Sequence, residues 1–185
     1  MEMMDNIIDG MILEINTWKA LVNECKEYIA DYMNSVTKRS YMRSSYSWGV
    51  FSSNEALQTR VKEKLELKIL DQIQSVTSTH KKMVLVVKNM RTLLQDVKKN
   101  YCTKQEGDPH QRTAEEIVGL VTKIHEMHSQ QIVLNKALFL DLFCERQSSE
   151  KVFTVYLSSW VYQPLIRQQY IDNLFAFKLE GKGGT

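Results

Sequence analysis

Two histidines in the third quarter of the chain are the first candidates for chemistry. The run His125-Glu126-Met127-His128 places its histidines three residues apart. The zincin metal-binding pattern needs them four residues apart with a glutamate between them. No cysteine or third histidine stands nearby in the sequence to complete a tetrahedral set of zinc ligands. We therefore predict no metal site and no metal cofactor here.

The sequence also lacks the signs of a cysteine nucleophile and of a nucleotide-binding loop. Cys25, Cys102 and Cys144 are odd in number, far apart and without a C-x-x-C spacing, which favours reduced structural thiols in an intracellular protein. Nothing in the sequence indicates the lowered thiol pKa that a nucleophile needs. The patterns G-x-x-x-x-G-K-[ST], G-x-G-x-x-G and G-x-S-x-G are all absent. We expect no catalytic residues, no cofactor and no enzyme activity.

A basic segment rich in aromatic residues offers a binding alternative. Basic side chains alternate there with rings, as in proteins that bind single-stranded nucleic acid: Lys38, Arg39, Tyr41, Arg43, Tyr46 and Trp48. A net charge of +2 is too small to indicate nucleic-acid binding by itself. We prefer a solvated turn in which Trp48 and Phe51 pack beneath the next helix, so direct nucleic-acid contact is the minor interpretation.

The element that must position any site is a long helix predicted over 53–102. Apolar residues recur there at alternating steps of four and three, the spacing that keeps one helix face against a partner: Ile69, Ile73, Val76, His80, Met83, Val87, Met90, Leu94, Val97 and Tyr101. The exception, His80, either fixes the register through a buried hydrogen bond or titrates near pH 6. A capping box, Ser52 with Glu55, predicts the start of this helix at Ser53.

Other helices must cover the apolar face of the long helix predicted over 53–102. Apolar periodicity predicts them over 4–37, 113–144, 149–162 and 165–178, followed by a disordered tail over 181–185. Gly10 should let the first turns fray, and a second capping box at Thr113 should open the third long helix. Pro164 predicts a break at Tyr162-Gln163.

The predicted fold class is therefore all-α. We expect one domain over 1–180, an elongated bundle or coiled coil of long antiparallel helices with a short C-terminal helical pair. No apolar run is long enough to cross a membrane. The last helix carries more apolar surface than it can bury alone, which indicates a docking surface.

The run from Tyr156 to Pro164, Y-L-S-S-W-V-Y-Q-P, resembles a motif of the cyclin-dependent kinase 2-interacting protein family. Asp5-Asn6 and Trp18 resemble the family's N-terminal segment, although the basic stretch usual before it is missing. The resemblance covers most of the chain, but only the tryptophan–proline run is specific. It implies a non-catalytic nuclear adaptor, with the cytoplasm as a second location, associated with cyclin-dependent kinase and checkpoint proteins.

The resemblance also implies assembly with a hexameric AAA ATPase pair and a second small helical protein, in large-ribosomal-subunit maturation and in clearing replication forks. We expect partner contacts at two sets of residues: Tyr156, Leu157, Trp160, Tyr162, Gln163 and Pro164 in the motif, and Ile73, His80, Val87 and Leu94 on the long helix. The rival hypotheses are a nucleic-acid adaptor using Lys38, Arg39, Arg43 and Tyr46, and a coiled-coil subunit of a kinetochore- or microtubule-type complex.

Overall fold

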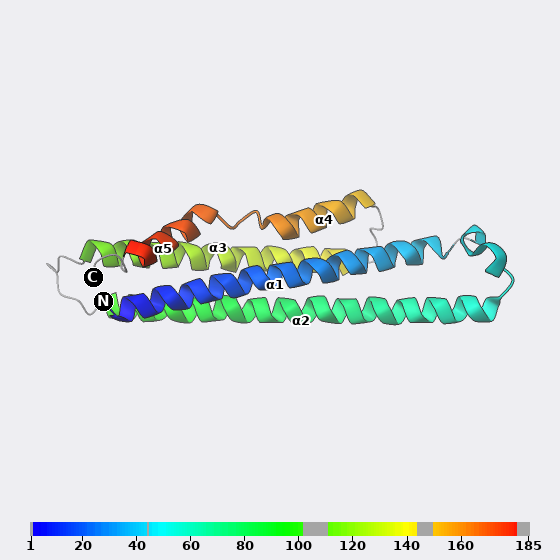
Figure 1. Cartoon of the computed structure of the whole chain (residues 1–185), viewed down its shortest axis with the longest axis horizontal. Helices are drawn as coiled ribbons and strands as arrows, with labels where there is room; N and C mark the ends of the chain where they lie inside the picture. Colours follow the sequence, from blue (N-terminus) through cyan, green and yellow to red (C-terminus); the bar gives the residue numbers. More distant parts are fainter. Residues whose placement is uncertain (1, 44, 102–110, 144–149, 181–185) are drawn as a thin grey trace. The chain divides into compact units, whose positions relative to one another are not determined.

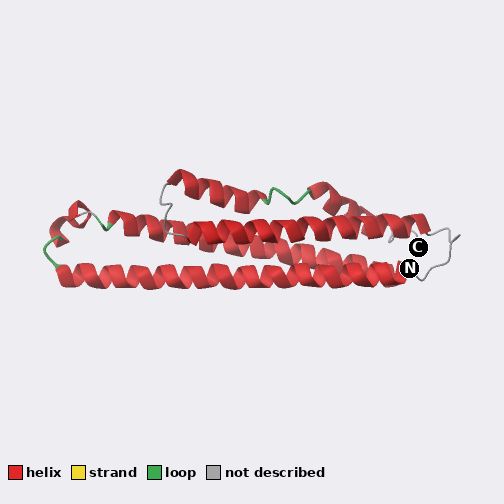
Figure 2. Cartoon of the chain, turned by 180° about the vertical axis from the view of Figure 1, so that it is seen from behind, coloured by secondary structure: helices red, strands yellow, loops and turns green. Residues whose placement is uncertain are grey.

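The computed structural model describes residues 2–43, 45–101, 111–143 and 150–180, and every element in this part of the chain is a helix (Figures 1 and 2). The elements are α1 (Glu2–Tyr41), the 3-10 helix η1 (Ser45–Phe51), α2 (Glu55–Tyr101), α3 (Gln111–Phe143), α4 (Glu150–Tyr162) and α5 (Gln168–Glu180). The predicted all-α helical fold is confirmed. The predicted tail over 181–185 lies outside the described residues.

The helix ends correct two details of the capping prediction. The side-chain oxygen of Asn54, not that of Ser52, accepts the backbone N–H of Leu57 at 3.0 Å, so Asn54 caps α2. α3 begins at Gln111, which places Thr113 inside its first turn rather than at its cap.

α1 already begins at Glu2, ahead of Gly10. The side chain of Leu93 packs on Gly10, where an added Cβ would meet the leucine Cδ2 at 3.0 Å.

The chain forms two compact units. Unit 1 comprises residues 1–20, 82–135 and 163–185, and unit 2 comprises residues 21–81 and 136–162. α1, α2 and α3 each contribute one stretch to each unit, and α5 belongs to unit 1 while α4 belongs to unit 2. The boundaries of the units therefore fall inside continuous helices.

Contacts within each unit fix the direction of α2 against α1. In unit 1, the Asn89 amide donates a hydrogen bond to the Glu14 carboxylate at 3.0 Å. In unit 2, the Thr79 hydroxyl donates to Glu24 at 3.4 Å. Each unit has a second contact between these helices, Gly10 with Leu93 in unit 1 and Arg39 with Glu66 in unit 2. Within each unit the α2 residue numbers fall as the α1 residue numbers rise, so the two helices are antiparallel there.

α2 buries a wider face than the predicted seam. Ile69, Val76, Met83, Met90 and Val97 recur at every seventh position and are each 4% exposed or less. The most buried residues between them are Gln72, Thr79 and Val86, whereas the predicted Ile73, His80 and Val87 are half-buried.

The geometry of Thr79 and His80 explains the difference. Thr79 contacts Glu24 on α1, and the ring of His80 lies edge-on to Phe139 of α3, with centroids 5.2 Å apart. Because α2 packs against two helices in unit 2, positions on both sides of the seam are covered. A pattern for one partner helix identifies only part of such a face.

Candidate partner-binding sites

Trp160, the centre of the family-like motif, is a core residue of unit 2. Its indole is 1% exposed and lies over Phe139, with ring centroids 4.8 Å apart. The indole N–H donates to the backbone carbonyl oxygen of Val22 at 3.1 Å. Trp160 thus attaches α4 to α1 and α3, and it is not accessible for direct contact with a partner.

The end of the motif is a tight turn that sets the path toward α5. α4 ends at Tyr162, and Gln163 adopts a φ of 46°, in the left-handed region that few non-glycine residues occupy. The Gln163 carbonyl accepts the N–H of Ile166 at 2.8 Å. Gln163 is buried, whereas Tyr162 is 81% exposed and Pro164 is exposed. The break predicted from Pro164 is present, and α5 begins at Gln168 rather than near 165.

A buried polar cluster on α3 holds the segment after this turn in unit 1. The Oε1 atom of Gln131 accepts the backbone N–H of Leu165 at 3.1 Å, and its Nε2 donates to Asn135 at 2.8 Å. One turn earlier, the sulfur of Met127 accepts the N–H of Arg167 at 3.4 Å. The partner of Gln131 lies 34 residues away, so the periodicity of α3 could not indicate this role.

His128 is completely buried in the same unit. Its Nδ1 lies 2.7 Å from the Ile124 carbonyl oxygen, so Nδ1 carries the proton, and Nε2 has no hydrogen-bond partner among the described residues. The ring lies edge-on to Trp18, with centroids 5.0 Å apart. Burial lowers the pKa of His128 to about 4. His125 bonds instead to the Ser129 hydroxyl at 3.2 Å.

Of the two remaining predicted contact residues in the motif, Tyr156 bonds to α3 and Leu157 lines a groove between α1 and α4. Tyr156 donates a hydrogen bond to Asp141, and this bond, with burial and the carboxylate charge, raises the pKa of the phenol to about 12. Leu157 is half-buried and lines the groove, whose volume is about 480 Å³. The other lining residues are Ala30, Met33, Asn34, Thr37, Ser40, Tyr41, Phe153 and Thr154.

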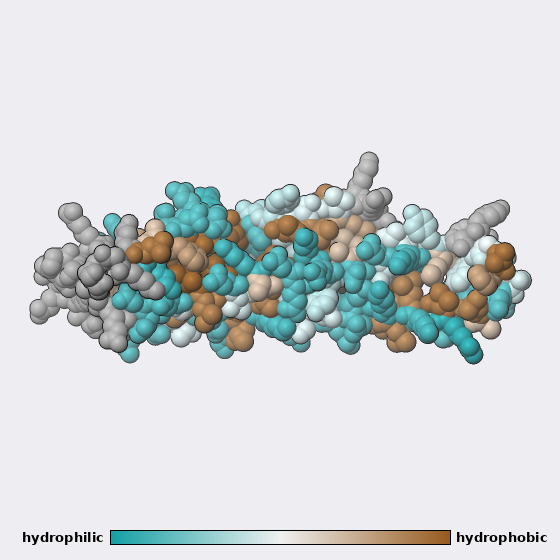
Figure 3. All heavy atoms as spheres, in the orientation of Figure 1, coloured by the Kyte–Doolittle hydropathy of each residue, from teal (hydrophilic) through white to brown (hydrophobic). Residues whose placement is uncertain are grey.

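The four predicted contact residues on α2 pack largely within the chain. Leu94 is 7% exposed, and Ile73, His80 and Val87 are half-buried. The chain's own helices therefore cover the seam that we expected a partner to occupy. The large exposed apolar side chains of α2 lie elsewhere, at Leu67, Leu70, Val84 and Leu85, which are 67, 56, 47 and 56% exposed. Figure 3 shows apolar residues in brown interrupting the polar surface in each unit.

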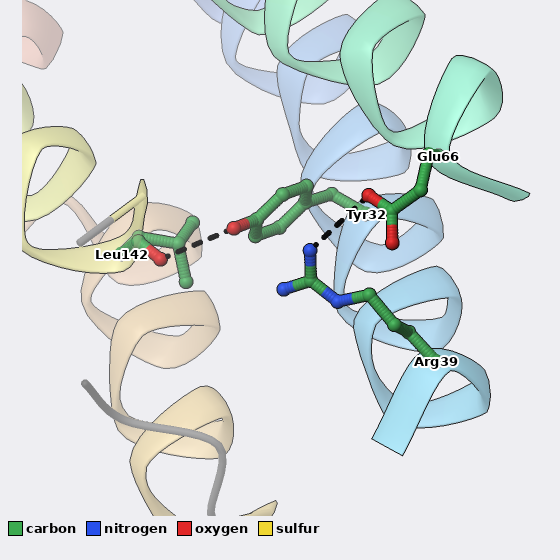
Figure 4. Close-up of polar contacts among 4 residues, drawn as sticks. All are labelled: Tyr32, Arg39, Glu66 and Leu142. Atoms are coloured by element: carbon green, nitrogen blue, oxygen red, sulfur yellow. Dashed lines mark hydrogen bonds and ion pairs between the residues drawn. The ribbon is translucent and has the colours of Figure 1, made fainter. Parts of the chain in front are cut away.

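The basic segment forms the connection between α1 and α2 in unit 2. Lys38 and Arg43 are exposed, and Arg39 pairs with Glu66 at 3.3 Å. Figure 4 shows that Arg39 turns toward α2, while Tyr32, earlier on α1, donates to the Leu142 carbonyl of α3 at 3.3 Å. The Tyr46 side chain lies outside the part of the structure that is described.

The aromatic residues of this connection do not pack as predicted. Trp48 is half-buried, its N–H donates to the Met42 carbonyl at 3.1 Å, and the Lys62 ammonium lies 5.6 Å from the ring centroid. Phe51 is 53% exposed and is not buried beneath α2. The 3-10 geometry of η1, with Gly49 at a φ of 50°, turns the chain in few residues and leaves Phe51 without cover.

Three further features of the described residues concern metal binding, membrane insertion and thiol reactivity. Among the described residues, no group of three or more His, Cys, Asp or Glu side chains could hold a metal ion. No described helix is long and apolar enough to span a membrane. Cys25 is fully buried, and burial, with the nearby charge of Glu24, raises its thiol pKa to about 12. Cys102 and Cys144 lie outside the described residues.

Comparison of the chain with protein-family models, with curated proteins and with solved structures found no match.

Proposed function

We propose that this protein is a non-catalytic helical adaptor, a subunit that joins a helical partner to an AAA ATPase in a nuclear complex. One observation carries the proposal: the chain covers its long hydrophobic seam with its own helices, yet large apolar side chains remain exposed on α2. Exposed apolar surface on a soluble bundle is typical of protein–protein interfaces. The resemblance of the Tyr156–Pro164 run to the cyclin-dependent kinase 2-interacting protein family supports the class of complex.

In the proposed mechanism, the C-terminal motif supports binding indirectly. Trp160 and Gln131 hold α4 and the segment before α5 against their units through the contacts with Val22 and Leu165. Partners bind the exposed side chains instead. Leu67 and Leu70 are three residues apart and so share one face of α2, where they form the candidate contact for a second helical subunit.

Ribosomal-subunit maturation and replication-fork maintenance are the processes that the resemblance implies for such an adaptor. Cyclin-dependent kinase and checkpoint proteins are the further proposed associates. The rival hypothesis of a kinetochore- or microtubule-type coiled-coil subunit shares the same binding face and differs in the partner.

Reconstitution tests the proposal. The full chain is co-expressed with the AAA ATPase pair and the small helical protein that the resemblance implies, and the mixture is separated by size-exclusion chromatography. We expect co-elution, and we expect Leu67→Ser combined with Leu70→Ser to abolish it with an unchanged circular dichroism spectrum. Leu140→Ser, which removes a side chain 61% exposed on α3, is the matched control and should still co-elute. A chain that elutes alone beside these partners, or that turns over a substrate unaided, contradicts the proposal.

A further inference from the structure

A small pocket in unit 2 lies between the end of α1 and the first turns of α2. Its volume is about 360 Å³. Among the described residues that line it, three side chains are cationic, one is anionic and two are apolar: Arg39, Arg43, Lys62, Glu66, Met42 and Leu65. Met42 and Leu65 are half-buried. The pocket therefore combines an excess of positive charge with an apolar lining.

Charge is concentrated around this pocket. Residues 38–68 contain seven Lys or Arg and three Asp or Glu residues, a net charge of +4. The other 154 residues contain 17 basic and 19 acidic side chains, a net charge of −2. A local field of this sign attracts an acidic ligand although the whole chain is nearly neutral.

The three cations of the pocket differ in their partners. Among the described lining residues, Glu66 is the one carboxylate; it is half-exposed and lies 3.3 Å from Arg39, which has a further contact of its own. Lys62 lies over the Trp48 ring. Arg43 forms no ion pair within the part of the chain that the structure describes. A guanidinium in this setting can accept a carboxylate through two parallel hydrogen bonds.

The 3-10 helix η1, which contacts two lining residues through Trp48, also exposes apolar side chains. Val50 is 88% exposed and Phe51 is 53% exposed. A ligand that carries only negative charge would leave these side chains and the Met42–Leu65 lining unused. A peptide that alternates acidic and apolar residues would use both kinds of surface.

We propose that this pocket binds an acidic, amphipathic peptide segment of a partner protein. Carboxylates of the segment pair with Arg39, Arg43 and Lys62, and an apolar side chain packs on Met42 and Leu65. Nucleic acid fits less well, because phosphates would leave the Met42–Leu65 lining unused and Lys62 already occupies one face of the Trp48 ring. The inference rests on the proposed binding function and names one chemical class of partner.

The test measures fluorescence anisotropy with a short labelled peptide in which aspartates and glutamates alternate with leucines. Arg43→Ser, at an exposed position, should weaken binding severalfold, and Arg39→Ser with Arg43→Ser should weaken it about tenfold or more. The matched control, Lys98→Ser with Lys99→Ser, removes the same charge from two exposed positions of α2 and should change affinity less than twofold. The same peptide with serine in place of leucine should bind the wild-type chain at least about tenfold more weakly.

Three results overturn the inference: no binding of the peptide, equal losses in the pocket and control variants, or tighter binding of single-stranded RNA that falls steeply with salt and depends on Arg39 and Arg43. The reconstitution experiment distinguishes failure of the pocket assignment from failure of the adaptor proposal. If the Arg39→Ser, Arg43→Ser protein assembles normally with its partners while the peptide fails to bind, the adaptor function stands and the pocket assignment does not.

Discussion

The indole N–H of Trp160 donates a hydrogen bond to the backbone carbonyl oxygen of Val22 across 138 residues of sequence, at 3.1 Å. This contact attaches the end of α4 to the middle of α1 within unit 2. The tryptophan was expected at a partner interface, and its burial shows that it stabilises the chain itself.

Trp160→Ala should lower the free energy of unfolding by about 3–5 kcal/mol, because it leaves a large cavity beside Phe139 and removes the contact with Val22. Trp160→Phe keeps most of the volume and should cost less. Urea denaturation followed by circular dichroism measures both. Tyr162→Ala, at a side chain 81% exposed, is the control and should change stability by less than about 0.5 kcal/mol. Equal effects of Trp160→Ala and Tyr162→Ala would show that the indole does not anchor α4.

Gln131→Leu should weaken the attachment of the segment before α5. The substitution removes the acceptor of the Leu165 N–H and the donor to Asn135, at a cost of about 1–3 kcal/mol for buried groups left without partners. Hydrogen exchange measured by NMR should be faster at the Leu165 amide in the variant. The Ile124 amide, inside α3, is the internal control and should stay protected. Unchanged exchange at Leu165 would contradict this role of Gln131.

His128 should make stability depend on pH. Its pKa is about 4 in the folded chain, against 6.5 for the ordinary side chain, so the unfolded chain binds the proton more readily between these values. The stabilisation is fully present above pH 6.5 and is lost as the pH falls toward 4, by on the order of 3 kcal/mol. Protonation would also bury a charged Nε2–H that has no acceptor among the described residues.

Urea midpoints of the wild type and of His128→Leu, measured from pH 7.5 to 4.5, test this dependence. The variant should lose less stability on acidification, although its value at pH 7.5 should be lower because the contact with Ile124 is gone. Gln130→Ala, at an exposed position of α3 that does not titrate, is the control and should keep the wild-type slope. Parallel curves for the wild type and His128→Leu would contradict the assignment.

Cys25 should be inert toward thiol reagents in the folded chain. Its side chain is 0% exposed and its thiol pKa is about 12, so very little thiolate exists at pH 8 and the reagent cannot reach it. In a Cys102→Ser, Cys144→Ser background, we expect labelling by a chromogenic disulfide only after addition of urea. Prompt labelling without urea would show that α1 opens readily at this position.

The sequence by itself determined the helices. Apolar spacing of three and four residues predicted five α-helices, and Pro164 predicted the break that follows Tyr162, because hydrophobic periodicity and proline geometry act over a few residues. The cap of α2 was predicted wrongly: the sequence pointed to the Ser52–Glu55 capping box, and only the backbone geometry selects the Asn54 oxygen.

Tertiary structure alone decided which side of each helix is covered. Two helices pack on α2 in unit 2, so Thr79 and His80 face different neighbours, and the pattern for one seam could not separate them. Periodicity likewise identifies Trp160 as an apolar position. It does not show whether Val22 or a partner accepts the hydrogen bond from the indole N–H. Contacts between residues more than 100 positions apart depend on how whole helices pack. The spacing of apolar residues within one helix does not determine that arrangement.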